Sequence, residues 1–146
     1  MHTLTTDVDN LALPKTLRGD ALLTVGAFDG IHIGHQALIR GLVAQAHEQG
    51  RLSGLVTFYP HPTVVLYPER PALYLTTPGE KAVLLESSGL DWVVMLSFTP
   101  SLAGMSPQGF CQMLVERMGM RELWVGPDAA LGQGRAGDLS TLRDLA

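Results

Sequence analysis

Apolar residues along this chain gather in short runs that alternate with segments of three- and four-residue spacing. The short runs are Leu22–Phe28, Leu55–Phe58, Trp92–Phe98 and Glu122–Val125. A short run of strand-forming residues between turn residues is typical of a β-strand, and a nearly continuous apolar run is typical of a strand covered on both faces. The four runs therefore predict four strands.

The segments between these runs carry the signals of helices. Across residues 35–50 the apolar positions fall on one helical face and end at a glycine. Residues 77–87 begin with the letters TPGE, which combine a capping threonine, a proline at the first helical position and a glutamate three residues after the cap. Ser106 followed by Pro107 predicts another helix start, and the tail after Val125 is predicted to be a glycine-rich loop that leads into a helix.

Strands that alternate with helices in this order predict an α/β protein. The expected architecture is an open, mainly parallel, doubly wound sheet of Rossmann-like type with helices on both faces. In such sheets ligands bind in the crevice at the carboxyl ends of the strands. The loops that follow Phe28, Phe58 and Val125 are therefore the candidate binding loops.

Composition narrows the classes of function. The 146 residues fit one domain, and 46% hydrophobic with 16% charged residues is typical of a globular chain. The net charge of −4 argues against a basic nucleic-acid surface, and no apolar run approaches the roughly 18 residues that span a bilayer. The N-terminus does not resemble a signal peptide, and the single Cys111 fits a reducing compartment as a small apolar residue of a helix. We therefore expect a cytoplasmic protein without nucleic-acid or membrane partners, and the oligomeric state stays open.

The first candidate loop holds glycines and histidines where a strand gives way to a helix. The first N–H groups of a helix have no partner within it and, with the helix dipole, attract anions such as phosphate. Gly26, Gly30 and Gly34 allow a ligand close to the backbone. His32 and His35 can each donate a hydrogen bond to a phosphate oxygen. This set suits a reaction in which negative charge develops on phosphorus.

Two other interpretations of the histidine pair stay open from the residues alone. The pair could be a surface coincidence, or it could be half of a metal site. A helical zinc pair usually has a spacing of four with a glutamate between, and no acidic residue lies between His32 and His35. No metal ligand is therefore predicted.

The segment GAFDGIHIGHQALI resembles the signature of the nucleotidyltransferase superfamily that carries the H-x-G-H motif. Within it the likeness is to the FMN adenylyltransferase (FAD synthetase) domain of bacterial bifunctional riboflavin kinase/FAD synthetases. Three further blocks are similar to that family in the same order: TFYPHP, the stretch from YLTTPGEK to LVERM, and ELWVGPDAALGQGRAGDLSTL. The resemblance covers roughly residues 20–143.

The resemblance implies transfer of AMP from ATP to FMN, giving FAD and pyrophosphate, with Mg²⁺ entering alongside ATP. It implies that His32 and His35 contact the ATP phosphates and stabilise the transition state. The residues implied to shape the nucleotide pocket are Gly26, Phe28, Asp29, Gly30 and Gly34. The residues implied to lie in the two later binding loops are Phe58, Pro60, His61 and Asp128.

The third candidate loop departs from the family pattern. Its letters GQGRAG match the dinucleotide fingerprint, but they do not directly follow a strand and no acidic residue follows about 20 positions on. Ala130 stands where the family has an arginine, and Ala27 stands where it usually has an asparagine. We expect one adenylyltransferase-like domain over residues 1–146 that lacks the C-terminal end of the family domain and any kinase domain.

Two other functions stay open beside adenylyl transfer to FMN. One is a nucleotide- or flavin-binding module without catalysis, which the loss of the arginine at Ala130 would favour. The other is a nucleotidyltransferase with a different phosphate acceptor.

Overall fold

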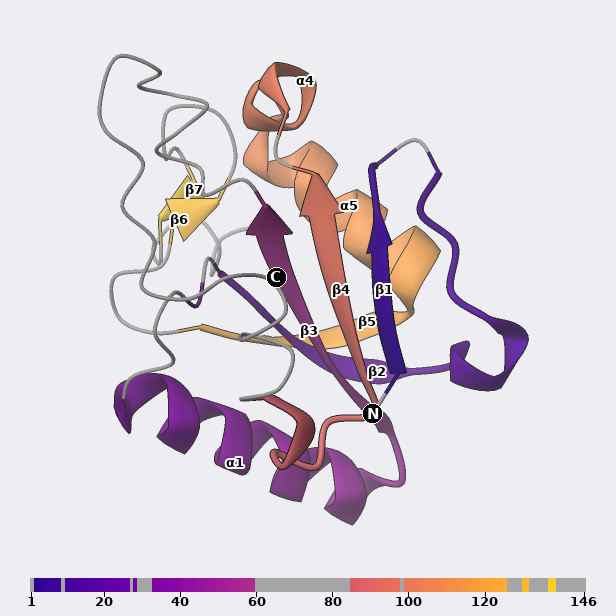
Figure 1. Cartoon of the computed structure of the whole chain (residues 1–146), viewed down its shortest axis with the longest axis vertical. Coiled ribbons are helices and arrows are strands. Elements are labelled where there is room, and N and C mark those ends of the chain that lie inside the picture. Colours follow the sequence, from indigo (N-terminus) through magenta and orange to yellow (C-terminus); the bar gives the residue numbers. More distant parts are fainter. Residues whose placement is uncertain are drawn as a thin grey trace.

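Five parallel strands form the central sheet of the computed structural model, which describes residues 2–8, 10–26, 28, 33–59, 85–97, 99–125, 130–131 and 137–138. Their order across the sheet is β1-β4-β3-β2-β5 (Figure 1). The strands are β1 (His2–Thr6), β2 (Ala21–Val25), β3 (Leu52–Tyr59), β4 (Trp92–Ser97) and β5 (Met120–Trp124).

Helices cover both faces of this sheet (Figure 1). Helix α1 (Ile33–Gln49) lies on one face, and α4 (Pro100–Ala103) and α5 (Pro107–Met118) lie on the other. The remaining elements are a 3₁₀ helix, η1 (Lys15–Leu17), and an antiparallel pair of two-residue strands, β6 (Ala130–Leu131) and β7 (Gly137–Asp138). The prediction of an open, doubly wound, parallel α/β sheet is confirmed.

The core consists of two apolar clusters, one on each face of the sheet. Successive side chains of a strand point to opposite faces. On β2, Leu22 therefore joins the cluster under α1, whereas Leu23 and Val25 join the cluster under α5. Because both faces are buried, the strand positions are apolar almost without interruption, which is why the continuous runs in the sequence predicted them correctly.

The predicted helix ends agree closely with the structure. Helix α1 ends before Gly50, which adopts the left-handed conformation at φ +66°. Helix α5 begins at Pro107, and the hydroxyl of Ser106 accepts a hydrogen bond of 3.0 Å from the backbone N–H of Gly109. Its end at Gly119 requires glycine, because a Cβ there would overlap the backbone of Gly19.

Several predicted boundaries are wrong. Strand β2 ends at Val25, so Phe28 lies beyond its end. Strand β5, Met120–Trp124, begins two residues and ends one residue before the predicted segment Glu122–Val125. Strand β3 begins at Leu52 because its first residues continue the pairing with β2, as in Leu22 with Ser53 and Leu23 with Gly54, although they are not strongly apolar.

Strand β1 and helix α4, like η1, β6 and β7, were absent from the sequence prediction. Strand β1 is an edge strand that pairs only with β4 and contains three threonines, so it carries no continuous apolar run. Helix α4 spans one turn and is capped by the hydroxyl of Thr99. The predicted helix over residues 77–87 is described only at its end, where Leu85 and Glu86 are helical and Gly89 follows at φ +88°.

The close packing of β3 against the Trp92 indole generates a test of the sheet. Gly54 pairs with Trp92, and a Cβ at Gly54 would overlap the indole ring. Gly54→Ala should therefore lower the free energy of unfolding by about 1–3 kcal/mol through overpacking, measured by urea denaturation. Gly104→Ala is the control, because Gly104 has an ordinary φ of −83° and its nearest neighbour would be 3.4 Å away. Equal stability of the two variants would contradict this account.

Candidate functional site

The strand order places a topological switch point at β2. Strand β2 is flanked by β3 on one side and β5 on the other, and all three run parallel. The chain leaves β2 through α1 on one face and reaches β5 from α5 on the other face (Figure 1). Ligands of open α/β sheets bind at the carboxyl ends of the strands at such a point. The candidate site is therefore the edge formed by Val25 and Trp124, where α1 begins.

The first turn of α1 is built to face an anion. It contains Gly34 and His35 and holds no acidic side chain. The N-terminus of a helix carries about half a positive charge together with N–H groups that point out of its end. A carboxylate in this turn would offset that charge, and none is there. The turn can therefore contribute backbone donors and an imidazole to a bound phosphate.

Phe28 connects the end of β2 with this helix. Its φ is +48°, in the left-handed region, and its side chain is only 5% exposed. A bulky residue in that conformation costs about 1–3 kcal/mol, which the surrounding structure must offset. Its ring meets the imidazole of His35 edge to face, with the ring centroids 4.9 Å apart and an interplanar angle of 70°.

The absence of a side chain at Gly26 leaves room for the Phe28 ring. The backbone N–H of Gly26 donates a 3.0 Å hydrogen bond to the carbonyl oxygen of Val56, which extends the pairing of β2 with β3 by one step. A Cβ at Gly26 would lie 3.1 Å from the Phe28 ring, closer than side chains normally pack. Glycine at this position therefore lets the phenyl ring lie against the strand end.

The structure brings some of the predicted site residues together. Just after β2, the ring of Phe28 lies against Gly26 and contacts the imidazole of His35. Gly34 and His35 both lie in the first turn of α1. Apart from Phe58, the other predicted residues of the site lie outside the described residues: Asp29, Gly30, His32, Pro60, His61 and Asp128.

Phe58 lies near the carboxyl end of β3 but on the other face of the sheet. Its side chain is 8% exposed and belongs to the cluster under α5, with its ring centroid 6.5 Å from that of Phe110. Phe28 belongs to the cluster under α1. The sheet therefore separates the two phenylalanine rings, and a role for Phe58 in binding stays a prediction.

Thr24, which lies two residues before Gly26, was not among the predicted site residues. Its side chain is fully buried on the α1 face, the face that Leu22 shares. Among the residues that the structure describes, the Thr24 hydroxyl has no hydrogen-bond partner. The single hydroxyl residue in the apolar run LLTV could have indicated Thr24 from the sequence. Unpaired buried polar groups are rare and costly, so such a residue in a buried strand is unusual.

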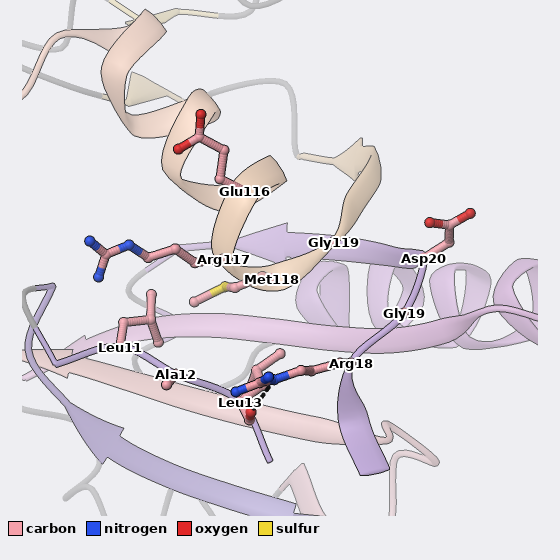
Figure 2. Close-up of a pocket in the computed structure, with 10 residues that line it drawn as sticks. All are labelled: Leu11, Ala12, Leu13, Arg18, Gly19, Asp20, Glu116, Arg117, Met118 and Gly119. Atoms are coloured by element: carbon pink, nitrogen blue, oxygen red, sulfur yellow. Dashed lines mark hydrogen bonds between the residues drawn. The ribbon is translucent and has the colours of Figure 1, made fainter. Parts of the chain in front are cut away.

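The hollow shown in Figure 2 lies at the opposite end of the sheet, near the starts of β2 and β5. Its volume is about 420 Å³, and it lies between residues 11–20 and the end of α5. Arg18 and Arg117 line it, and each donates a hydrogen bond to a backbone carbonyl of the segment 8–13, at 2.9 and 2.7 Å. Asp20 is paired with Arg121 at 2.9 Å. The Arg117 hydrogen bond joins the N-terminal segment to α5, the Arg18 hydrogen bond lies within that segment, and the Asp20 pair joins it to β5. These charged side chains therefore support the fold.

Other candidate chemistries are sparse in the described part of the chain. There, no group of three or more His, Cys, Asp or Glu side chains gathers to hold a metal ion. No described helix combines the length and apolar character needed to cross a membrane. Cys111 packs against the α5-side cluster, and burial raises the pKa of its thiol, which lowers its reactivity.

Comparison with known proteins identifies relatives of most of this chain. The family model for FAD synthetase matches residues 15–146. A bifunctional riboflavin kinase/FMN adenylyltransferase of Listeria monocytogenes is 32% identical over 126 residues, which are 86% of this chain and 40% of that protein. The proteins of the same name from Escherichia coli and Pseudomonas fluorescens are 32% and 36% identical over 84% and 82% of this chain, and 39% of each relative. The chain thus spans about two fifths of the length of these curated relatives.

A solved structure shares the fold. The crystal structure of a macrolide-efflux protein from Streptococcus pneumoniae superposes with a TM-score of 0.85, covering 100% of this chain and 47% of that one. The two sequences are 24% identical, so this likeness shows the fold alone.

The buried Thr24 hydroxyl generates a test of the site. Thr24→Val replaces an unpaired hydroxyl with a methyl group of the same shape, so it should raise the free energy of unfolding by about 1 kcal/mol in a urea titration. Thr57→Val is the matched control, because Thr57 is equally buried on β3 and does have an interaction partner. That variant should lose about 1 kcal/mol. A loss of stability in Thr24→Val would mean that its hydroxyl is paired in solution.

Proposed function

This chain belongs to the FAD synthetase family, and from that membership we propose that it transfers the adenylyl group of ATP to FMN, forming FAD and pyrophosphate. The relatives named above are adenylyltransferases of FMN by their names, which supports this acceptor over another phosphate. The observation that carries the proposal is the placement of His35 and Gly34 in the first turn of α1, at the switch point of the sheet.

The reaction is an in-line displacement at phosphorus. A phosphate oxygen of FMN attacks the α-phosphorus of ATP, and a new P–O bond forms. The bond between the α-phosphorus and the oxygen that bridges to the β-phosphate breaks, and its electron pair leaves with pyrophosphate. No covalent enzyme intermediate is required, so catalysis rests on placing the two substrates and on stabilising developing charge.

The residues around the start of α1 supply that stabilisation in the proposal. The imidazole of His35 and the N–H groups of the first helical turn donate hydrogen bonds to ATP phosphate oxygens. His32, three residues earlier in the H-x-G-H motif, acts as a second donor. Gly34, which has no Cβ, allows the nucleotide to approach the backbone, whereas the space beside Gly26 holds the Phe28 ring.

Mg²⁺ enters with ATP in this proposal. The ion usually keeps several waters and is bound through substrate phosphates and one or two carboxylates, so it needs no dedicated protein cage. When bound it neutralises triphosphate charge and favours departure of pyrophosphate.

A second candidate function follows from Ala130 at the arginine position of the family pattern. An alanine there removes a charge and five hydrogen-bond donors that could serve a phosphate. A protein so altered could bind ATP or FMN without turnover. Incubation of the 146-residue chain with ATP, FMN and Mg²⁺ and chromatographic detection of FAD distinguishes the two functions: binding without FAD would overturn the proposed transfer.

The histidines of the motif provide the first test. His35→Ala and His32→Ala should each lower kcat for FAD formation by about 10²–10³-fold, because each removes a donor that acts on developing charge. His47→Ala is the matched control, since His47 is exposed in the last turn of the same helix. It should retain wild-type kcat. Full activity in His35→Ala, with folding confirmed by circular dichroism, would refute the assigned role.

Metal removal provides the second test. Excess EDTA should abolish FAD formation, and added Mg²⁺ should restore it, because the ion accompanies ATP in the proposal. The unfolding temperature of the ligand-free chain should not change with EDTA. Undiminished turnover in EDTA would contradict the proposed role of the ion.

A further inference from the structure

Phe28 has an unusual backbone for a large side chain. Of the described residues other than glycine, it alone has a positive φ, at +48°. Steric crowding makes this region unfavourable for a bulky residue, so such a conformation persists only where the surroundings impose it. Strained residues of this kind gather at functional sites, and Phe28 lies between the end of β2 and the start of α1.

Two features hold the Phe28 side chain in place. Its ring is 5% exposed within the α1-side cluster, where Leu22 and Leu55 are also buried. Gly26 leaves the space that the ring fills, since a Cβ there would come within 3.1 Å of it. The hydrogen bond from Gly26 to Val56 ties the backbone at that point to β3. The ring therefore has a fixed position relative to the end of the sheet.

The fixed ring contacts His35. The centroids are 4.9 Å apart at an interplanar angle of 70°, within the range of favourable edge-to-face pairs. The backbone of α1 sets where the His35 side chain starts, but the final torsion of a histidine has broad, nearly two-fold minima. A neighbouring ring at this angle restricts the plane in which the imidazole lies. The turn that strains Phe28 is thus the turn that brings its ring against His35.

We infer that Phe28 is a positioning residue that orients the His35 imidazole toward the bound triphosphate, an inference that rests on the proposed function. Donors that stabilise a transition state act only within a narrow range of position and angle. An imidazole that can rotate would contact ground-state phosphates some of the time but would meet the developing charge less often. Loss of the ring should therefore lower kcat more than it raises KM.

Phe28→Leu tests this inference in the full chain. Leucine keeps an apolar side chain and the same unfavourable backbone conformation but removes the ring, so the contact with His35 is lost while burial is largely kept. We expect kcat for FAD formation to fall about tenfold, the rate equivalent of one aromatic contact, with KM for ATP changed by less than about twofold. Phe28→Tyr, which keeps the ring, should recover most of kcat.

A spectroscopic measurement reads the orientation directly. In protein labelled with ¹³C at histidine, the ring resonances of His35 are assigned from their loss in His35→Gln. We expect Phe28→Leu to shift the His35 resonances, since the ring current of the neighbouring phenyl group is removed, and to leave those of the exposed His47 in place. Leu114→Val is the control for loss of buried volume, because Leu114 is fully buried under α5 on the opposite face. It should retain both kcat and the His35 resonances.

The outcomes separate this inference from the proposed function. If the wild-type chain forms FAD and Phe28→Leu keeps its kcat, or if Leu114→Val loses as much, the positioning role is overturned. Unmoved His35 resonances in folded Phe28→Leu would overturn it as well. If the wild-type chain forms no FAD, the proposed function fails, and the resonances of His35 in the two variants still test the ring contact without turnover.

Discussion

The pairing of β2 with both β3 and β5 fixes the rest of this structure. All five residues of β2 are buried, and its two edges are satisfied by parallel ladders, as in Val25 with Val56 and Thr24 with Trp124. A parallel strand enclosed in this way must send its chain out at the carboxyl edge and over one face, which here is the face of α1. The chain to β5 crosses the other face. The crevice at the switch point is therefore a consequence of the strand order and not a separate feature.

The residues whose local structure is unfavourable for their type lie near the end of β2. Most segments agree with their surroundings: apolar strands are buried on both faces, and Ser106 caps α5. Thr24 and Phe28 disagree, one by burying an unpaired hydroxyl among the described residues and the other by a left-handed backbone. Both flank Gly26. Natural chains violate local rules chiefly at functional or strained sites, so this clustering supports the same location that the strand order selects.

The sequence predicted four of the five strands of the sheet and the helices α1 and α5, because their signals are local. Continuous apolar runs predicted β2, β3 and β4, and a glycine predicted the end of α1. The motif GAFDGIHIGH indicated a family, which the match over residues 15–146 confirms. What failed depends on tertiary contact. Strand β1 is polar because an edge strand needs only backbone pairing with β4. Phe28 was predicted to belong to a strand, because an aromatic residue after an apolar run has strand propensity. Its positive φ cannot be recognised from the sequence of this segment. Side-chain alternation along β3 could have placed Phe58 with Val56 on the α5 face.

The two ends of the sheet differ in whether the charges near them are paired within the protein. At the amino end, the arginines beside the hollow are held by backbone carbonyls and Asp20 by Arg121, so their hydrogen bonds serve the fold. At the carboxyl end, the first turn of α1 has no acidic side chain to offset its dipole. A chain with a net charge of −4 has no general attraction for anionic nucleotides. In the proposed function, recognition of phosphate then depends on short-range groups at one place, the start of α1 and the imidazole of His35. Such groups act only when their directions are set, and the inferred role of the Phe28 ring, which lies against His35 from a strained backbone position after β2, is to set the plane of that imidazole.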